Sequence, residues 1–241
     1  LQEIKAKAGD GQVRAVYAGI TGIGNRPESA HAVKSIFKNF FPNAKIEIVI
    51  DMVLGYRSHF EIGEGIFLYA GTGSIAIHIN QAGEIIRAGG WGYLLGDEGA
   101  GYWMGREAIR RVVSALDMKL RLESFESEIL REISTNDWDG IKAFVYSKDR
   151  SVIASLARTV IDLANSGDET ARDIVLTAAD YLVNLVHQIE LVSGKRNLPV
   201  VFGGGISEAG ELLIDAINRG IGRNVIISNL RMANRAAELA R

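Results

Sequence analysis

Short β-branched runs alternate with helical stripes along the chain, an order typical of α/β proteins. Five such runs predict strands, at residues 13–18, 46–50, 66–70, 199–202 and 225–227. After residue 74, isoleucines alternate with other residues up to Asn80, which predicts a further strand, and a short turn at 81–83 leads into another at 84–87. The strands between 66 and 87 are therefore expected to form an antiparallel meander.

Apolar residues spaced three and four apart predict helices, mainly in the second half of the chain. These stripes fall within residues 101–120, 153–164 and 171–189, and further helices are expected at about 29–40 and 207–218. No repeat of 20–50 residues and no low-complexity segment interrupts the pattern. The expected fold class is α/β, with mixed sheets flanked by helices.

The composition excludes several kinds of chemistry. The 241 residues include 27 Lys and Arg, 29 Asp and Glu, and no cysteine. Without cysteine the chain forms no disulfide, thiolate zinc site, cysteine-ligated iron–sulfur cluster or cysteine nucleophile. The balanced charge argues against nucleic-acid partners, and the lack of an 18-residue apolar stretch or a signal-like N-terminus argues against a membrane partner. We expect a soluble, cytoplasmic protein.

Two glycine segments are candidates for holding phosphate, although neither matches GxxxxGK[ST] or GxGxxG. Gly71-Thr72-Gly73-Ser74 lies between two predicted strands, where a hydroxyl beside bare amides can hold a phosphoryl group; an ordinary tight turn is the alternative. Gly203-Gly204-Gly205 joins a predicted strand to a helix start, which favours an anion or a closely packed nucleotide. Close packing of the strand on the helix is the alternative there.

Two acidic positions also suggest chemistry. Asp51 follows a predicted strand and could accept a proton from a substrate hydroxyl, or it could cap the next helix. Residues 89–103 contain six glycines, two tryptophans and the adjacent acids Asp97 and Glu98. Such a loop suits a polyhydroxylated ligand, because a carboxylate accepts hydrogen bonds from hydroxyls and an indole covers an apolar sugar face. Asp97 or Glu98 could also cap the following helix. The four histidines show no metal-ligand spacing, so no metal-ligating residue is predicted.

The order of these motifs resembles a known family. A strand ending at Asp51 is followed by Gly71–Ser74, then by Gly89–Gly92 with Trp91, then by Gly96–Gly99, and last by Gly203–Gly205. This order resembles the BadF/BadG/BcrA/BcrD ATPase family, and within it the N-acetylglucosamine kinase-like sugar kinases of the actin-like, hexokinase and Hsp70 superfamily. The resemblance implies an actin-like ATPase (ribonuclease H-like) fold of two lobes. Residues 1–60 would belong to the N-terminal lobe, with 231–241 packing back on it, and residues 61–230 would form the C-terminal nucleotide- and sugar-binding lobe.

The resemblance also implies roles for single residues. Asp51 would be the catalytic base of ATP-dependent phosphorylation of a hexose or amino sugar, such as glucose, glucosamine or N-acetylglucosamine. The ATP-binding residues would be Gly71, Thr72, Gly73, Gly203, Gly204 and Gly205. The sugar-binding residues would be Ser74, Gly90, Trp91, Gly92 and Asp97. ATP and Mg²⁺ would be the cofactors, and the protein would be a homodimer.

The chain departs from the family pattern at two points. It contains no Asp-Gly-Gly-Gly-Thr type phosphate loop, so we expect it to begin in the helix after the family's first hairpin, with an incomplete N-terminal lobe. Ile75 stands where animal N-acetylglucosamine kinases have an asparagine that reaches the sugar. Two other functions stay open: a non-catalytic sugar or nucleotide sensor, and a BadF-type ATPase that lacks an iron–sulfur cluster.

Overall fold

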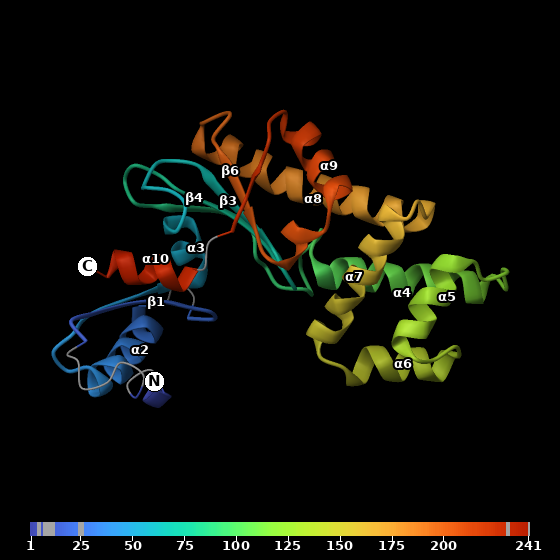
Figure 1. Ribbon diagram of the computed structural model, residues 1–241, viewed down its shortest axis with the longest axis horizontal. Coiled ribbons are helices and arrows are strands. Elements are labelled where there is room, and N and C mark those ends of the chain that lie inside the picture. The colour runs from blue at the N-terminus through green and yellow to red at the C-terminus, as the bar shows by residue number, and fades with distance from the viewer. Residues whose placement is uncertain (4–5, 7–12, 24–26, 230–231, 241) are drawn as a thin grey trace. The chain divides into compact units, whose positions relative to one another are not determined.

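The computed structural model describes residues 1–3, 6, 13–23, 27–229 and 232–240 (Figure 1). They divide into two compact units, Leu1–Gly63 with Asn229–Arg241, and Glu64–Ser228. Arg231 and Arg241, which belong to the segment expected to pack back on the first lobe, lie outside the described residues. Within the described ranges, no helix combines the length and apolarity needed to cross a membrane.

The smaller unit is built on two parallel strands joined by a helix. Its elements are β1 (Ala15–Ile20), α2 (Pro27–Phe40), β2 (Lys45–Ile50), α3 (Asp51–Arg57) and α10 (Met232–Leu239). Ile20 is opposite Ile50, so β1 and β2 end at the same level. Because parallel strands present their carboxyl ends at one edge, the residues that follow β1 and β2 are neighbours.

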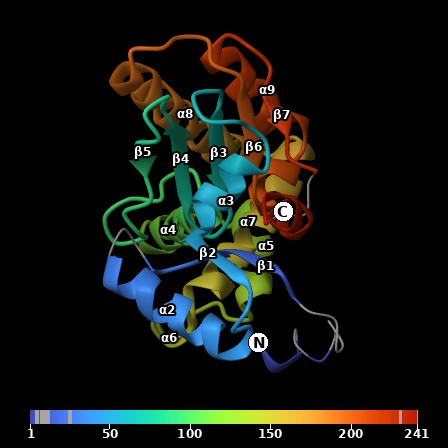
Figure 2. The ribbon, with the colours of Figure 1, turned by 90° about the vertical axis from the view of Figure 1, so that its left-hand side faces the viewer.

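The larger unit contains a mixed five-stranded sheet. Its strands are β3 (Ile66–Ala70), β4 (Ser74–Ile79), β5 (Ile85–Gly89), β6 (Val200–Gly203) and β7 (Ile226–Ile227). Figure 2 shows them in the order β5-β4-β3-β6-β7. The expected antiparallel meander of β3, β4 and β5 is confirmed. β6 and β7 continue the sheet in parallel with β3.

The described helices of the larger unit are α4 (Gly101–Asp117), α5 (Ser124–Ile133), α6 (Trp138–Ser147), α7 (Arg150–Asn165), α8 (Glu169–Ser193) and α9 (Glu211–Ile221). For the helix predicted at 207–218, the predicted first residue is wrong. A 3₁₀ turn at Gly205–Glu208 comes first, and α9 begins only after Gly210, whose φ of 98° does not continue a helix. α5 and α6 were not predicted.

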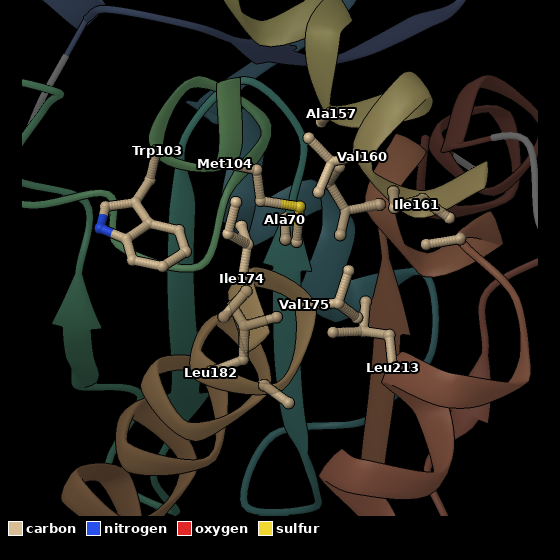
Figure 3. Packing of buried hydrophobic residues seen from close by; sticks show 14 of the residues in the cluster. Ala70, Trp103, Met104, Ala157, Val160, Ile161, Ile174, Val175, Leu182 and Leu213 are labelled. Atoms are coloured by element: carbon tan, nitrogen blue, oxygen red, sulfur yellow. The ribbon is translucent and has the colours of Figure 1, made fainter. Parts of the chain in front are cut away.

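The core of the larger unit lies between the sheet and these helices. One row of residues crosses four strands, Ala88, Ala76, Leu68 and Phe202, each opposite the next. Figure 3 shows Met104 of α4, Val160 of α7, and Ile174 and Leu182 of α8 gathered around Ala70 at the end of β3. This packing fixes the start of α4, the second half of α7 and the carboxyl end of β3 as one rigid framework.

Candidate functional site

Asp51 lies in the smaller unit, immediately after β2. The Thr21 hydroxyl donates to Asp51 Oδ2 at 2.7 Å, and the Met52 N–H donates to Oδ1 at 2.9 Å. Asp51 is the first residue of α3 rather than its cap, a position that Ile50 holds without any side-chain hydrogen bond. The capping alternative is therefore wrong, and the half-buried carboxylate keeps lone pairs for a substrate.

The Gly71–Ser74 segment is a tight turn at the carboxyl end of β3, in the larger unit. Ala70 pairs with Ser74, and the Gly71 N–H donates to the Gly73 carbonyl at 2.9 Å. The first amides of α4 hold this turn: Gly101 N–H donates to the Gly71 carbonyl at 2.8 Å, and Tyr102 N–H donates to that of Thr72 at 3.2 Å. The start of a long buried helix thus fixes the conformation of the turn.

Asp97 lies against this turn. A Cβ on Gly73 would be 2.5 Å from Asp97 Oδ2, so any other residue there would displace the carboxylate from this position. The Ser74 N–H donates to Asp97 Oδ1 at 3.4 Å, and the Ser74 hydroxyl donates to the Glu98 carbonyl at 2.8 Å. The N-cap of α4 is Ala100, without a side-chain hydrogen bond, so the proposed capping by Asp97 or Glu98 is wrong. The carboxylate of Asp97 instead joins the turn to the glycine-rich loop.

The surroundings of Asp97 shift its titration. Its side chain is 7% exposed, and burial raises the pKa of the carboxyl above its ordinary value. The Ser74 N–H and the positive charge of Arg150 lower this pKa and offset part of the effect, while the neighbouring Glu98 adds to the rise. Arg150, the first residue of α7, also lies 5.9 Å from the centre of the Tyr93 ring. Asp97 is thus a desolvated hydrogen-bond acceptor with a cation nearby.

The tryptophan-bearing part of the loop is anchored at one point and exposed at its tip. Gly90, with φ 68°, donates its N–H to the Ser74 carbonyl at 2.9 Å, and a Cβ there would lie 2.6 Å from Ile75 Cδ1. The Trp91 side chain is 64% exposed, and the Arg87 guanidinium lies 4.5 Å from its ring centre. Gly92 follows with φ 84° and open space around it. Trp91 can therefore cover a ligand.

The second tryptophan of this segment has a structural role. Trp103 is 7% exposed and belongs to the core between α4 and α8 (Figure 3). Its ring and that of Tyr181 are arranged edge to face, with the ring centres 5.3 Å apart. The interpretation that the tryptophans of this segment serve a ligand therefore holds at most for Trp91.

The Gly203–Gly205 segment lies beside the carboxyl end of β3, just before the Gly71–Ser74 turn, because β6 is parallel to β3. A Cβ on Gly203 would touch the Phe67 ring at 3.1 Å, and one on Gly204 would lie 2.3 Å from the Ala70 carbonyl oxygen. Close packing thus explains these two glycines. They pack against the neighbouring strand β3, however, and not on a helix as the alternative proposed. Gly205 is different, since nothing lies within 4 Å of its Cβ position. Both glycine segments lie at the carboxyl edge of the sheet, the usual ligand-binding edge of α/β proteins.

Gly205 borders a cavity of about 400 Å³ between the β6–α9 connection and α7. Its walls include apolar positions and several polar side chains: Ala154, Ser155, Ala157, Arg158, Ile161, Asp162, Asn165, Gly205, Ile206, Glu208, Ala209 and Gly210. A mostly apolar cleft with a few polar groups is typical of small-molecule sites. The cavity has room for a nucleoside.

The larger unit therefore brings together the predicted residues of three segments, Gly71–Ser74, Gly90–Asp97 and Gly203–Gly205, whereas Asp51 belongs to the other unit. Sequence reasoning missed Thr21, Arg87, Arg150 and the cavity residues of α7. Thr21 follows a strand just as Asp51 does, and this shared position could have identified it. The polar residues of α7 lie beside a predicted core stripe and carried no signal of their own.

Metal-binding residues were not predicted. In the part of the chain that the structure describes, no group of three or more His, Asp or Glu is placed to hold a metal ion. His78 is a core residue, fully buried, with Nδ1 2.7 Å from the Gly65 carbonyl oxygen. Magnesium does not need such a cluster, because it is commonly held by nucleotide phosphates, water and one or two carboxylates.

Comparison with known proteins identifies a family whose model matches this chain and two related kinases. The model of the BadF/BadG/BcrA/BcrD ATPase family matches residues 1–238. The N-acetylmuramic acid/N-acetylglucosamine kinase of Clostridium acetobutylicum is 28% identical over 204 residues, which are 83% of this chain and 67% of that protein. The N-acetyl-D-glucosamine kinase of Dictyostelium discoideum is 29% identical over 166 residues, 66% of this chain and 52% of that protein. The chain thus spans between about half and two thirds of these relatives.

Solved structures show the fold. A candidate N-acetylglucosamine kinase from Chromobacterium violaceum matches 98% of this chain and 80% of its own, with TM-score 0.76 and 24% identity. A ROK family glucokinase from Streptomyces griseus, solved with glucose and AMPPNP, matches 86% of this chain and 72% of its own, with TM-score 0.56 and 16% identity. The expected actin-like α/β fold is confirmed.

Proposed function

Because the chain belongs to the BadF/BadG/BcrA/BcrD ATPase family, we propose that it is an ATP-dependent sugar kinase that phosphorylates a hydroxyl of a hexose or amino sugar. One observation carries the proposal: the Asp97 carboxylate lies against Gly73, at the sheet edge where Gly204 packs on the Ala70 carbonyl. A desolvated acceptor for hydroxyls thus lies at the same sheet edge as two bare stretches of backbone, and one of these stretches borders a cavity. The names of the two kinase relatives support the same substrate class.

In this proposal the nucleotide occupies the larger unit. The nucleoside enters the cavity of about 400 Å³ beside Gly205, and its phosphates extend along the sheet edge toward Gly71, Thr72 and Gly73. Absence of a Cβ lets backbone N–H groups approach phosphate oxygens. Gly203 and Gly204 contribute through packing, since they let the Gly205 segment lie close to β3.

The sugar lies in the glycine-rich loop. Asp97 accepts hydrogen bonds from sugar hydroxyls, and its position depends on the Ser74 N–H and on the space left by Gly73. Gly90 and Gly92 let the backbone turn with positive φ on either side of Trp91, whose exposed ring covers an apolar face of the sugar. The Ile75 side chain packs against Gly90, so it supports the backbone of the glycine-rich loop at that residue.

Asp51 is the proposed general base. Its carboxylate, held by Thr21 and Met52, accepts the proton of the sugar hydroxyl that attacks the γ-phosphorus of ATP. The division into two compact units supports the assignment of residues 1–60 with 231–241 to one lobe, and of residues 61–230 to the nucleotide- and sugar-binding lobe.

Mg²⁺ would bind as part of a Mg·ATP complex, an ion that substrate phosphates and one or two carboxylates commonly hold in such sites. When bound, it neutralises charge on the phosphoryl oxygens. A homodimer belongs to the same proposal because the family resemblance implies it. A cytoplasmic location without nucleic-acid partners is supported by the absence of cysteine and by the balanced charge.

Release of ADP tests the proposal and separates it from the two alternatives. The protein, expressed with whatever sequence precedes Leu1 in its gene, is mixed with Mg·ATP and a panel of hexoses and amino sugars. Release of ADP that depends on one of the sugars is the expected result. Release independent of sugar would show a cluster-free ATPase, and sugar or nucleotide binding without release would show a sensor.

A further inference from the structure

The carboxylate of Asp51 is held by two elements of the smaller unit. Oδ2 accepts a hydrogen bond from the Thr21 hydroxyl at 2.7 Å, and Oδ1 accepts one from the Met52 N–H at 2.9 Å. The Met52 contact comes from the same helix as Asp51 and follows from its position at the start of α3. The Thr21 contact joins residues 30 positions apart and is not a consequence of local geometry.

The fold brings Thr21 to this place for identifiable reasons. Thr21 and Asp51 each follow the last residue of a parallel strand, and those last residues, Ile20 and Ile50, are paired. Gly19 allows β1 to approach α3 closely, because a Cβ there would lie 2.8 Å from Leu54 Cβ and 3.1 Å from the Asp51 Cα. After Thr21 the chain turns at Gly22, with φ 81°. The position of the hydroxyl is thus fixed by the backbone of β1, which pairs with β2 and packs against α3.

Burial does not explain the contact. Thr21 is exposed, so water could satisfy its hydroxyl without Asp51. A hydrogen bond between exposed groups adds little to stability. The bond does, however, restrict rotation of the carboxylate about its broad terminal torsion, because it holds Oδ2 while the Met52 N–H holds only Oδ1. A general base gains from such restriction, because proton transfer requires one oxygen to lie within hydrogen-bonding reach of the reacting hydroxyl.

We propose that Thr21 is a positioning residue for Asp51; this inference rests on the proposed role of Asp51 as general base. A hydroxyl both donates and accepts, so Thr21 donates to the carboxylate before the reaction and can accept from the protonated acid after it. The contact therefore persists through proton transfer. Thr21 itself exchanges no proton with the substrate.

The test uses variants that separate the hydroxyl from the rest of the side chain. Thr21→Val keeps the shape and removes the hydroxyl, Thr21→Ser keeps the hydroxyl and removes the methyl, and Thr21→Ala is a second variant without the hydroxyl. We expect Thr21→Val and Thr21→Ala to lower kcat about 10-fold, with KM for ATP and sugar within about 2-fold. Thr21→Ser should retain kcat within about 2-fold, and all three should melt close to the unmodified protein.

Asp51→Asn distinguishes failure of this inference from failure of the proposed function. If Thr21 acts through Asp51, Thr21→Val should change kcat less than about 2-fold in an Asp51→Asn background. Three results would each overturn the positioning role alone. The first is a full 10-fold loss of kcat for Thr21→Val in that background, and the second is a lowered kcat of Thr21→Ser. The third is an unchanged kcat of Thr21→Val where Asp51→Asn alone lowers kcat strongly. Unchanged turnover of Asp51→Asn would overturn the base itself, and the positioning role with it.

Discussion

Replacement of Gly204 by alanine tests the junction of the two glycine segments. Gly204 has φ 95° and ψ 165°, a region that is almost exclusive to glycine and that costs another residue about 1–3 kcal/mol. Its Cβ would also lie 2.3 Å from the Ala70 carbonyl oxygen and 2.7 Å from the Ala70 carbonyl carbon. These atoms belong to β3, which pairs with strands on both sides and cannot move aside. Overpacking of this kind costs about 1–3 kcal/mol more.

Together the two effects amount to about 4 kcal/mol of unfolding free energy for the larger unit. In a unit of this size, each kcal/mol lowers Tm by about 2–4 °C, so Gly204→Ala should lower its melting temperature by about 8–16 °C. Differential scanning calorimetry measures the transition directly. Catalytic assays are not needed, so the result does not depend on the proposed activity.

Gly205→Ala is the matched control. Gly205 has open space around its Cβ position and no positive φ. Alanine there should leave Tm unchanged or slightly higher, because it reduces the entropy of the unfolded chain. A melting temperature of Gly204→Ala within about 3 °C of the unmodified protein would refute the contact between the two segments. An equal fall in Gly205→Ala would refute the distinction between the two glycines.

Four further predictions concern function. Asp51→Asn should lower kcat at least about 100-fold while ATP affinity, measured by titration calorimetry, stays within about 2-fold; normal turnover would remove Asp51 from the mechanism. Asp97→Asn should raise KM for the sugar at least about 10-fold and leave KM for ATP nearly unchanged. On acidification the Asp97 carboxylate takes up a proton and loses acceptor capacity, so the unmodified protein should lose sugar affinity. Because burial raises the pKa of Asp97, this loss should begin at a higher pH than for an aspartate with the ordinary pKa of 3.8. A pH series of sugar binding that is flat down to pH 4 would contradict this. Gly205→Val should raise KM for ATP about 10-fold by filling the cavity, with KM for the sugar as the internal control.

Most of the larger unit could be predicted from local patterns. The meander followed from period-two alternation between glycine turns, and α4, α7 and α8 followed from stripes of buried residues. α5 has such a stripe in Phe125, Ile129 and Ile133, and periodicity could have found it. α6 buries Ile141 alone among its described residues, so its apolar pattern was too weak to predict it.

The site was harder to predict because its contacts join distant segments. The approach of Gly204 to Ala70 depends on β6 pairing with β3, a choice that no local pattern shows. The contact of Asp97 with Gly73 depends on a loop path in which Asp97 itself takes φ 65°. The link between Thr21 and Asp51 depends in the same way on parallel pairing of β1 with β2.

Transfer of labelled phosphate tests the central claim most directly. ATP labelled at the γ-phosphate is incubated with the full-length gene product and with each sugar of the panel in turn. A sugar kinase must place the label on a sugar, and Asp51→Asn must lower the rate of this product at least about 100-fold. Label recovered only as inorganic phosphate, or left on ATP while a sugar binds, would contradict the account.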